Sequence, residues 1–255
     1  MKRWHLFEFE DQNWFPQYLH DFITDMLQYH ITTLELYMPA IHKVIKLLQV
    51  TNSNRIVDLC SGGGGTFLPF QEILEKQGYS VSITLSDKYP NIEAFQKIHQ
   101  LSNQRINFYP ESVDVTNVPE ELKGIRTLFT AFHHFQPKIA QKILQDAVIK
   151  KTAIGIFEFT ERKFSRVLDM LQVGLKVFFD TQYIRPFKWS RLFWTYIIPI
   201  VPFIYCWDGT VSQLRTYSVE ELRNMVSEIN SETYYWEMGK LEYITYLIGY
   251  PIEET

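Results

Sequence analysis

The sequence has little cysteine, little charge and no apolar run long enough to cross a membrane. Its 255 residues contain two cysteines, Cys60 and Cys206, so we do not expect a disulfide framework and favour a reducing compartment. Charged residues make up 21%, and the formal net charge of −4 argues against a general nucleic-acid-binding surface. The uncharged stretch Leu192–Cys206 is shorter than the about 20 residues that a spanning helix needs. Residues 1–8 turn acidic before any apolar run develops, unlike a signal peptide, so we expect a cytoplasmic protein.

Aromatic residues, by contrast, are abundant. They make up 16% of the chain, with 19 Phe and 15 Tyr, and hydrophobic residues together make up 46%. These values are typical of a globular protein, and 255 residues fit one enlarged domain. The aromatic excess indicates an apolar cavity or surface in addition to an ordinary core.

The most informative stretch runs from Arg55 to Leu74. Arg55–Leu59 has the short, β-branched pattern of a buried strand, the four glycines 62–65 follow, and residues 66–74 have helical spacing. A strand, a glycine turn and a helix form the first half of a nucleotide-binding unit, in which glycine lets a ligand approach the backbone. Asp58 lies just before this turn. Its carboxylate would repel a pyrophosphate but attract a ligand that carries an ammonium group.

These residues resemble the first motif of class I S-adenosylmethionine (SAM)-dependent methyltransferases, hydrophobic-Asp-x-x-x-Gly-x-Gly, with Asp58, Gly62 and Gly64 in register. SAM carries the ammonium group that Asp58 would attract. The resemblance implies that SAM is the cofactor and that Ser61, within the same loop, takes part in binding it.

Two further carboxylates follow the next strands. The strand predicted at 80–85 leads into Asp87, where an acidic residue can accept hydrogen bonds from both ribose hydroxyls of a nucleoside. Beyond the strand predicted at 106–109, the resemblance places Asp114 at the adenine amino group, with Val115 beside it. A single Asp more often caps a turn than binds a ligand. Three carboxylates at the ends of successive strands favour a shared cofactor site instead.

A histidine pair follows the fourth predicted strand, 126–131. A His pair recurs at this position in small-molecule methyltransferases, so the resemblance implies that His133 or His134 serves the substrate and that Phe132 borders the cofactor. Histidine suits proton transfer near neutral pH. Because adjacent side chains should point in different directions, we expect at most one ring to face the site. The alternative is that both rings fix the loop by hydrogen bonds.

Residues 160–216 form an insertion before the core pattern resumes. A helix is predicted over 162–179, with one apolar face that includes Phe164, Leu168 and Leu175. Residues 185–206 that follow favour a lid over an aromatic pocket, and a contact with a membrane surface is the alternative. The lid would line a cavity with Phe187, Trp189, Phe193, Trp194 and Tyr196. The membrane contact would bring anionic headgroups to Arg185, Lys188 and Arg191.

The predicted fold is α/β: a Rossmann-like, doubly wound sheet, mostly parallel, with a C-terminal antiparallel strand. Residues 1–50 should add N-terminal helices that cover either the substrate side or the sheet edge. The core comprises 51–159 and 217–255, in which aromatic runs at 233–237 and 243–248 indicate a closing antiparallel pair. With the helical and aromatic insertion 160–216 after strand 5, residues 1–255 are predicted to form a single domain.

The predicted function is SAM-dependent methyl transfer to a small, hydrophobic acceptor, with O- or N-methylation favoured and no metal. Two alternatives stay open. The first is an NAD(P)-dependent oxidoreductase, whose glycine motif would need a third glycine at the position of Phe67. The second is a protein that binds SAM through the same carboxylates but does not catalyse methyl transfer. A nucleic-acid methylase is not favoured, because residues 131–134 lack the Asn/Asp-Pro-Pro-aromatic motif of amino-group methylases.

Overall fold

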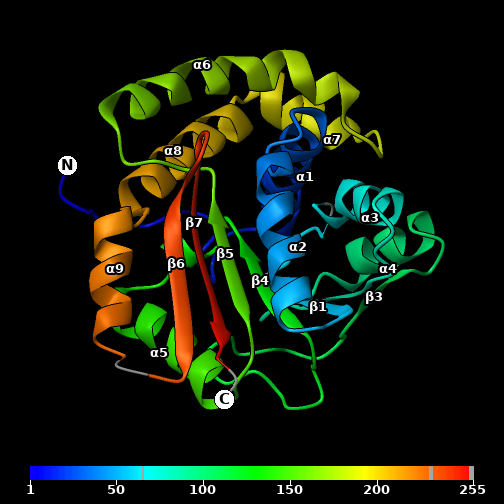
Figure 1. Cartoon of the computed structure of the whole chain (residues 1–255). Coiled ribbons are helices and arrows are strands. Elements are labelled where there is room, and N and C mark those ends of the chain that lie inside the picture. Colours follow the sequence, from blue (N-terminus) through cyan, green and yellow to red (C-terminus); the bar gives the residue numbers. More distant parts are fainter. Residues whose placement is uncertain (65, 230–231, 253–255) are drawn as a thin grey trace.

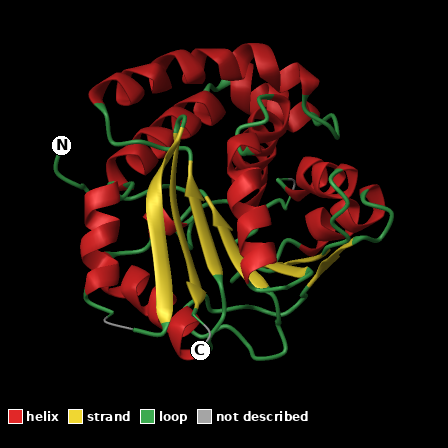
Figure 2. Cartoon of the chain, in the orientation of Figure 1, coloured by secondary structure: helices red, strands yellow, loops and turns green. Residues whose placement is uncertain are grey.

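The computed structural model describes residues 1–64, 66–229 and 232–252, so Gly65 of the predicted glycine turn lies outside the described residues. Within them, seven strands form one sheet in the order β3-β2-β1-β4-β5-β7-β6 (Figures 1 and 2). The strands are β1 Arg55–Asp58, β2 Ser82–Leu85, β3 Ile106–Phe108, β4 Ile125–Phe129, β5 Ile154–Glu158, β6 Tyr234–Leu241 and β7 Ile244–Pro251.

The strand directions confirm the predicted sheet. β1 to β5 are parallel, and β7 enters between β5 and β6 as an antiparallel strand. Ile248 of β7, for example, pairs with Gly155 of β5 and with Glu237 of β6. Dinucleotide-binding domains instead continue their strand order as 3-2-1-4-5-6. The sheet order therefore separates this fold from that of the NAD(P)-dependent alternative.

Alternate residues of the strands face opposite sides of the sheet, and helices cover both sides. Ile56 belongs to the hydrophobic core on one side, and Val57 belongs to the core on the other. The first core includes α2 Ile41–Val50, α3 Phe67–Lys76 and α4 Ile92–Leu101. The second includes α5 Pro137–Ile149 and α9 Val219–Ser227.

The two N-terminal helices take different positions. α1 Gln17–Thr33 packs against the insertion and places Ile23 and Leu27 at the cavity described below. α2 packs against β5 and β7, so it covers a face of the sheet and not its edge. The expectation that these helices cover the substrate side therefore fits α1 alone.

The insertion forms a helical layer over one end of the sheet. It comprises α6 Phe164–Asp180, α7 Trp189–Leu192, a π-helical turn at Phe193–Ile197, and α8 Ile200–Arg215. α8 lies between α6 and the end of the sheet at which the β6–β7 hairpin turns (Figure 1). The helices approach closely at Gly174, where an added Cβ would lie 3.2 Å from Cys206 Cβ.

The apolar face predicted for the helix of residues 162–179 points away from the core. Phe164, Leu171 and Leu175 are 68%, 61% and 63% exposed, whereas Met170 and Val177 are buried. α6 has a second, narrower apolar face around Gly174, and α8 packs on that one because the missing side chain allows close approach. The helical periodicity was therefore correct, but the face that it identified is the outer one.

Replacing Ile248 by Ala should lower the free energy of unfolding by about 2–5 kcal/mol, because the truncated side chain would leave a cavity in the hydrophobic core against β7. Ile248 is 0% exposed. Ile149→Ala is the matched control, since Ile149 is 78% exposed and its truncation should change stability by less than about 0.5 kcal/mol. Urea denaturation measures both, and equal losses would contradict the buried position of β7 between β5 and β6.

Candidate active site

The glycine turn between β1 and α3 lies at the carboxyl end of β1, the edge at which open α/β sheets bind ligands. Gly62 and Gly64 have φ angles of +52° and +72°, which glycine adopts without steric cost. A Cβ on Gly64 would lie 2.5 Å from Leu85 Cδ1, whereas a Cβ on Gly62 would meet no atom within 4 Å. The backbone at Gly62 therefore borders open space and can be approached by a ligand.

Asp58 is buried beneath this turn. It is 4% exposed, and its Oδ1 accepts a hydrogen bond of 2.7 Å from Thr127 Oγ1. Burial raises the pKa of the Asp58 carboxyl to about 7, and the negative charge of Asp87 adds to the rise. A cationic ligand beside Asp58 would favour its charged form, so the site suits the ammonium group predicted from the sequence.

Hydrogen bonds join the glycine turn to the end of β2. The backbone N–H of Ser61 donates to Ser86 O at 3.0 Å, and that of Gly62 donates to Asp87 Oδ2 at 3.0 Å. Asp87 Oδ1 accepts a hydrogen bond of 2.9 Å from the backbone N–H of Tyr89. The structure thus brings together five of the predicted cofactor residues: Asp58, Ser61, Gly62, Gly64 and Asp87.

Asp114 and Val115 lie on the loop after β3. The backbone N–H of Val113 donates to Asp87 O at 2.9 Å, which holds this loop against the end of β2. Asp114 is exposed, and its Oδ1 accepts hydrogen bonds from the backbone N–H (2.8 Å) and Oγ1 (2.6 Å) of Thr116. Val115 is buried. Asp114 therefore caps a turn, and its contact with adenine stays a prediction.

The histidine pair lies in a 3₁₀ turn, Phe132–His134, directly after β4. Phe132 is buried, and its ring packs on Tyr217 with the ring centroids 5.5 Å apart. This contact anchors the turn to the core. The predicted contact of Phe132 with the cofactor stays a prediction.

His133 forms a buried pair with Glu158, the last residue of β5. His133 Nδ1 lies 2.8 Å from Glu158 Oε2, and the backbone N–H of His133 donates to Oε1 at 3.1 Å. Burial alone would raise the pKa of Glu158, but His133 holds it below its ordinary value. A carboxylate only accepts hydrogen bonds, so Nδ1 donates to Glu158, and in the neutral ring Nε2 is the nitrogen that can accept a proton. Nε2 is buried and has no hydrogen-bond partner among the described residues.

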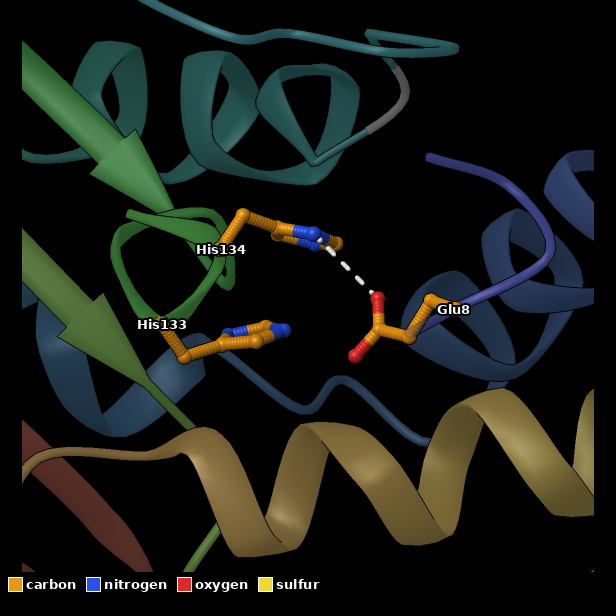
Figure 3. Close-up of side chains that lie close together, drawn as sticks. All are labelled: Glu8, His133 and His134. Atoms are coloured by element: carbon orange, nitrogen blue, oxygen red, sulfur yellow. Dashed lines mark ion pairs between the residues drawn. The ribbon is translucent and has the colours of Figure 1, made fainter. Parts of the chain in front are cut away.

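His134 belongs to a second ion-paired group, whose acidic members, Glu8 and Asp11, come from the N-terminal segment (Figure 3 shows Glu8). Its Nδ1 lies 3.2 Å from Glu8 Oε2 and 3.0 Å from Asp11 Oδ1. Arg215 Nη1 lies 3.3 Å from the same oxygen of Glu8 and 2.6 Å from Asp11 Oδ2. Burial opposes a charged ring, but Glu8 and Asp11 raise the pKa of His134 to about 9. His134 is therefore a cation at neutral pH and holds its proton.

The expectation that at most one ring faces the site is wrong. The ring centroids of His133 and His134 lie 4.3 Å apart with an interplanar angle of 32°, and both rings point toward Glu8 (Figure 3). Side chains alternate in extended backbone, whereas these residues lie in a 3₁₀ turn. The two rings differ in their hydrogen-bond partners. His134 is held as a cation by Glu8 and Asp11, whereas His133 Nε2 has no partner among the described residues.

Sequence reasoning missed three members of this site: Glu8, Glu158 and Arg215. Glu158 ends the fifth strand at the same sheet edge as the predicted carboxylates, and that position was a usable signal. Glu8 and Arg215 gave no local signal, because the N-terminal segment and α8 are in contact in the fold but far apart in the sequence. Glu8 and Ser212, for example, are hydrogen-bonded and lie 204 positions apart.

Glu8, His133 and His134 have ligand atoms within 4.8 Å of one another, close enough to hold a metal ion. The charges nearby do not fit one. Arg215 Nη1 lies 3.3 Å from both Glu8 Oε2 and His134 Nδ1, and His134 itself is protonated. Two cations therefore already balance Glu8.

A cavity of about 310 Å³ lies beside the histidine turn. It is lined by residues that follow β4 and β5 and by residues of the N-terminal segment, α1, α6 and α8, so the insertion does cover this edge of the sheet. The apolar part of its lining includes Ile23, Leu27, Met170, Val173 and Tyr205, and the polar part includes Glu8, Thr130, His133, His134 and Thr160.

The residues expected to line this cavity do not do so, and that expectation is wrong. Phe187, Trp189 and Phe193 are 47%, 78% and 43% exposed. Trp194 and Tyr196 are also absent from the cavity wall among the described residues. Phe187, Trp189, Phe193 and Tyr196 lie on the outside of the layer, whereas Trp194 packs against the core that α1 shares with α6 and α8. The roof of the cavity is formed by α6 and α8.

The stability that His134 contributes should depend on pH. Its pKa is about 9 in the folded chain against about 6.5 in the unfolded one, so the contribution is complete below pH 6.5 and is lost as the pH rises through 9. The free energy of unfolding of the wild type should exceed that of His134→Gln by on the order of 2 kcal/mol at pH 6, and the difference should vanish by pH 10. Thermal melts across this range measure it, with the exposed His42→Gln as control. A difference that is constant with pH would contradict the ion pairing of His134.

Solved structures resemble this chain, although no protein-family model and no curated protein matches its sequence. An O-methyltransferase family protein from Burkholderia thailandensis has a TM-score of 0.53 over 91% of this chain at 14% identity, and this chain spans 60% of that protein. The plantazolicin methyltransferase BpumL, in complex with SAH, has a TM-score of 0.53 at 13% identity, with 96% of this chain and 93% of that one covered. The methyltransferase domain of bacterial CtHen1-CN has a TM-score of 0.50 at 12% identity, with 85% and 100% covered. The chain has the fold of the class I SAM-dependent methyltransferases.

Proposed function

We propose that this protein transfers a methyl group from SAM to a hydroxyl oxygen of a small, hydrophobic acceptor. The observation that carries the proposal is the His133–Glu158 pair, whose free Nε2 is buried at the cavity on the carboxyl edge of the sheet. The fold shared with methyltransferases supports it independently.

The residues of the glycine turn fit SAM. The buried carboxyl of Asp58 would meet the ammonium group, and the bare backbone at Gly62 allows close approach. Asp87 would accept hydrogen bonds from the ribose hydroxyls. The remaining residues that we assign to the cofactor are Ser61, Gly64, Asp114, Val115 and Phe132. When bound, SAM supplies a methyl group that its sulfonium charge has already activated.

The protein's own task is then to position the acceptor and remove its proton. A hydroxyl is a weak nucleophile until an adjacent base activates it, whereas a neutral amine attacks without prior deprotonation. His133 Nε2 is the base in this proposal, and Glu158 holds its tautomer and stabilises the imidazolium that forms. A dedicated buried base therefore favours an oxygen acceptor over a nitrogen acceptor.

His134 has a supporting role in this scheme. Its proton is held by Glu8 and Asp11, so it fixes the N-terminal segment against the histidine turn and leaves proton transfer to His133. The apolar walls provided by α1 and α6 suit a hydrophobic acceptor, and the cavity volume of about 310 Å³ limits it to a small molecule.

Isothermal titration calorimetry tests the cofactor. The wild type should bind SAM and its product S-adenosylhomocysteine but not NAD(H). Asp87→Ala should weaken binding by about 1–3 kcal/mol, because the ribose hydroxyls lose a charged acceptor. Glu72→Ala, an acidic residue of α3 whose side chain is 70% exposed, is the control and should bind normally. Binding of NAD(H) alone would overturn the assignment.

Transfer of labelled methyl groups from SAM to a panel of hydrophobic phenols and amines tests the chemistry. Phenols should be the better acceptors, and His133→Gln should lower kcat by about 10²–10⁴-fold with unchanged SAM affinity, because only proton removal is lost. His42→Gln, on the exposed side of α2, should retain full activity. A folded His133→Gln variant with wild-type turnover would make the pair structural, and SAM binding without any transfer would favour the non-catalytic alternative.

A further inference from the structure

The outer face of the insertion is apolar over an unusual length. Along α6, five residues spaced by three or four positions share one stripe of the helix and are 48–70% exposed. These are Phe164, Leu168, Leu171, Leu175 and Phe179. Figure 1 shows α6 as the outermost helix of the molecule, with α8 between it and the sheet. No described element covers this stripe.

The segment after α6 extends the same apolar surface. The rings of Phe178 and Tyr196 have centroids 6.0 Å apart, and Tyr196 Oη donates to Phe178 O, so the π-helical turn lies beside the end of α6. The exposed apolar residues of this segment are Phe187, Trp189, Phe193, Tyr196 and Ile197. Together with the α6 stripe they form what we call the outer apolar surface.

This surface is held in place from beneath. Arg191 is 1% exposed and pairs with Asp25 of α1, and Lys188 Nζ lies 3.5 Å from the same carboxylate. Val177 of α6 and Val201 of α8 belong to one buried core with α1. The exposed side chains are therefore presented by a packed layer, which is the opposite of what a closing lid would need.

The buried position of Arg191 also corrects an expectation. Arg185, Lys188 and Arg191 were predicted to meet anionic headgroups together, but Arg191 is enclosed and Lys188 is partly neutralised by Asp25. Arg185 is exposed and donates only to the backbone carbonyls of Gln182 and Ile184 among the described residues. Its charge is available beside Phe187 and Trp189.

The local charge differs in sign from that of the whole chain. Residues 163–203 contain six Lys and Arg against two Asp, a net charge of +4, within a chain whose formal net charge is −4. Lys188 and Arg191 pair with Asp25 of α1, which lies outside this range. Lys163, Lys176 and Arg185 are exposed, and of these Lys163 pairs with Glu161 and Lys176 with Asp180. A positively charged, aromatic-rich surface is complementary to the interface of an anionic lipid bilayer, in which aromatic rings and the stems of basic side chains are both accommodated.

We propose that the outer apolar surface docks onto an anionic lipid membrane, with α6 lying in the plane of the interface. Among the described residues no single helix is both long enough and apolar enough to cross a membrane. The helices Trp189–Ile197 and Ile200–Arg215 meet both criteria only when taken together, and they are bent by 78° relative to each other. A second copy of the chain fits this surface less well, because a twofold interface would bring together two copies of a face on which Lys163, Lys176 and Arg185 are exposed. The proposal does not depend on SAM binding.

Flotation of the full chain with phosphatidylcholine vesicles, with and without phosphatidylglycerol, tests the proposal. The protein should float only with the anionic vesicles, and added salt should reduce binding. Leu171→Glu with Leu175→Glu should lower the partition coefficient by about tenfold or more, because it replaces apolar contact with like charge. Leu101→Glu with Ile149→Glu, residues 59% and 78% exposed on other helices, is the matched control and should float like the wild type.

Further measurements separate the outcomes. Arg185→Glu should weaken flotation and its salt dependence without changing the melting temperature, since the side chain is exposed and contacts only nearby backbone. Light scattering detects self-association. A dimer that the Leu171/Leu175 variant dissociates, together with no flotation, would assign the surface to a second copy and overturn the proposal. Flotation equal in the Leu171/Leu175 variant and the control would also overturn it. SAM calorimetry reports on the proposed function separately.

Discussion

The ion pair between Glu8 and Arg215 connects the parts of this molecule that the fold alone would leave separate. Both side chains are 3% exposed, and each also contacts the histidine turn through His134. A buried charge without its partner is costly, so neither residue is stable in this position alone. The N-terminal segment, α8 and the histidine turn are therefore held as one unit. The cavity wall depends on that unit, because all three elements contribute to it.

Local patterns were sufficient to predict the sheet and the meeting of Asp58, the glycine turn and Asp87 at its carboxyl edge. The strand that ends in Asp58, the glycines that follow and the acidic ends of the next strands are each encoded within a few residues. Parallel strands place their carboxyl ends at one edge, so topology brings these local signals together without further information. The hydrogen bond between Gly62 and Asp87 is one product of that topology.

The acceptor side could not be predicted in the same way. Periodicity finds an apolar face on residues 164–179 but does not say whether a neighbour covers it, and α6 has two such faces. The direction of the histidine rings depended on a 3₁₀ turn in place of extended backbone. The partners of His134 come from the N-terminal segment and α8, which lie about 200 positions apart in the sequence. Contacts of this kind are properties of tertiary packing and leave no trace in a short window of sequence.

The docking of the N-terminal segment also has a consequence for the order in which the protein matures on the ribosome. Asp11 and Arg215, which are ion-paired in the finished molecule, are 204 positions apart. Synthesis proceeds from the N-terminus, so Glu8 and Asp11 emerge before His134, and they meet Arg215 only when α8 has left the exit tunnel. Five parallel strands can assemble before then. The nascent chain thus carries Glu8 and Asp11 without Arg215 until α8 is made, and the two sides of the candidate site are completed at different times.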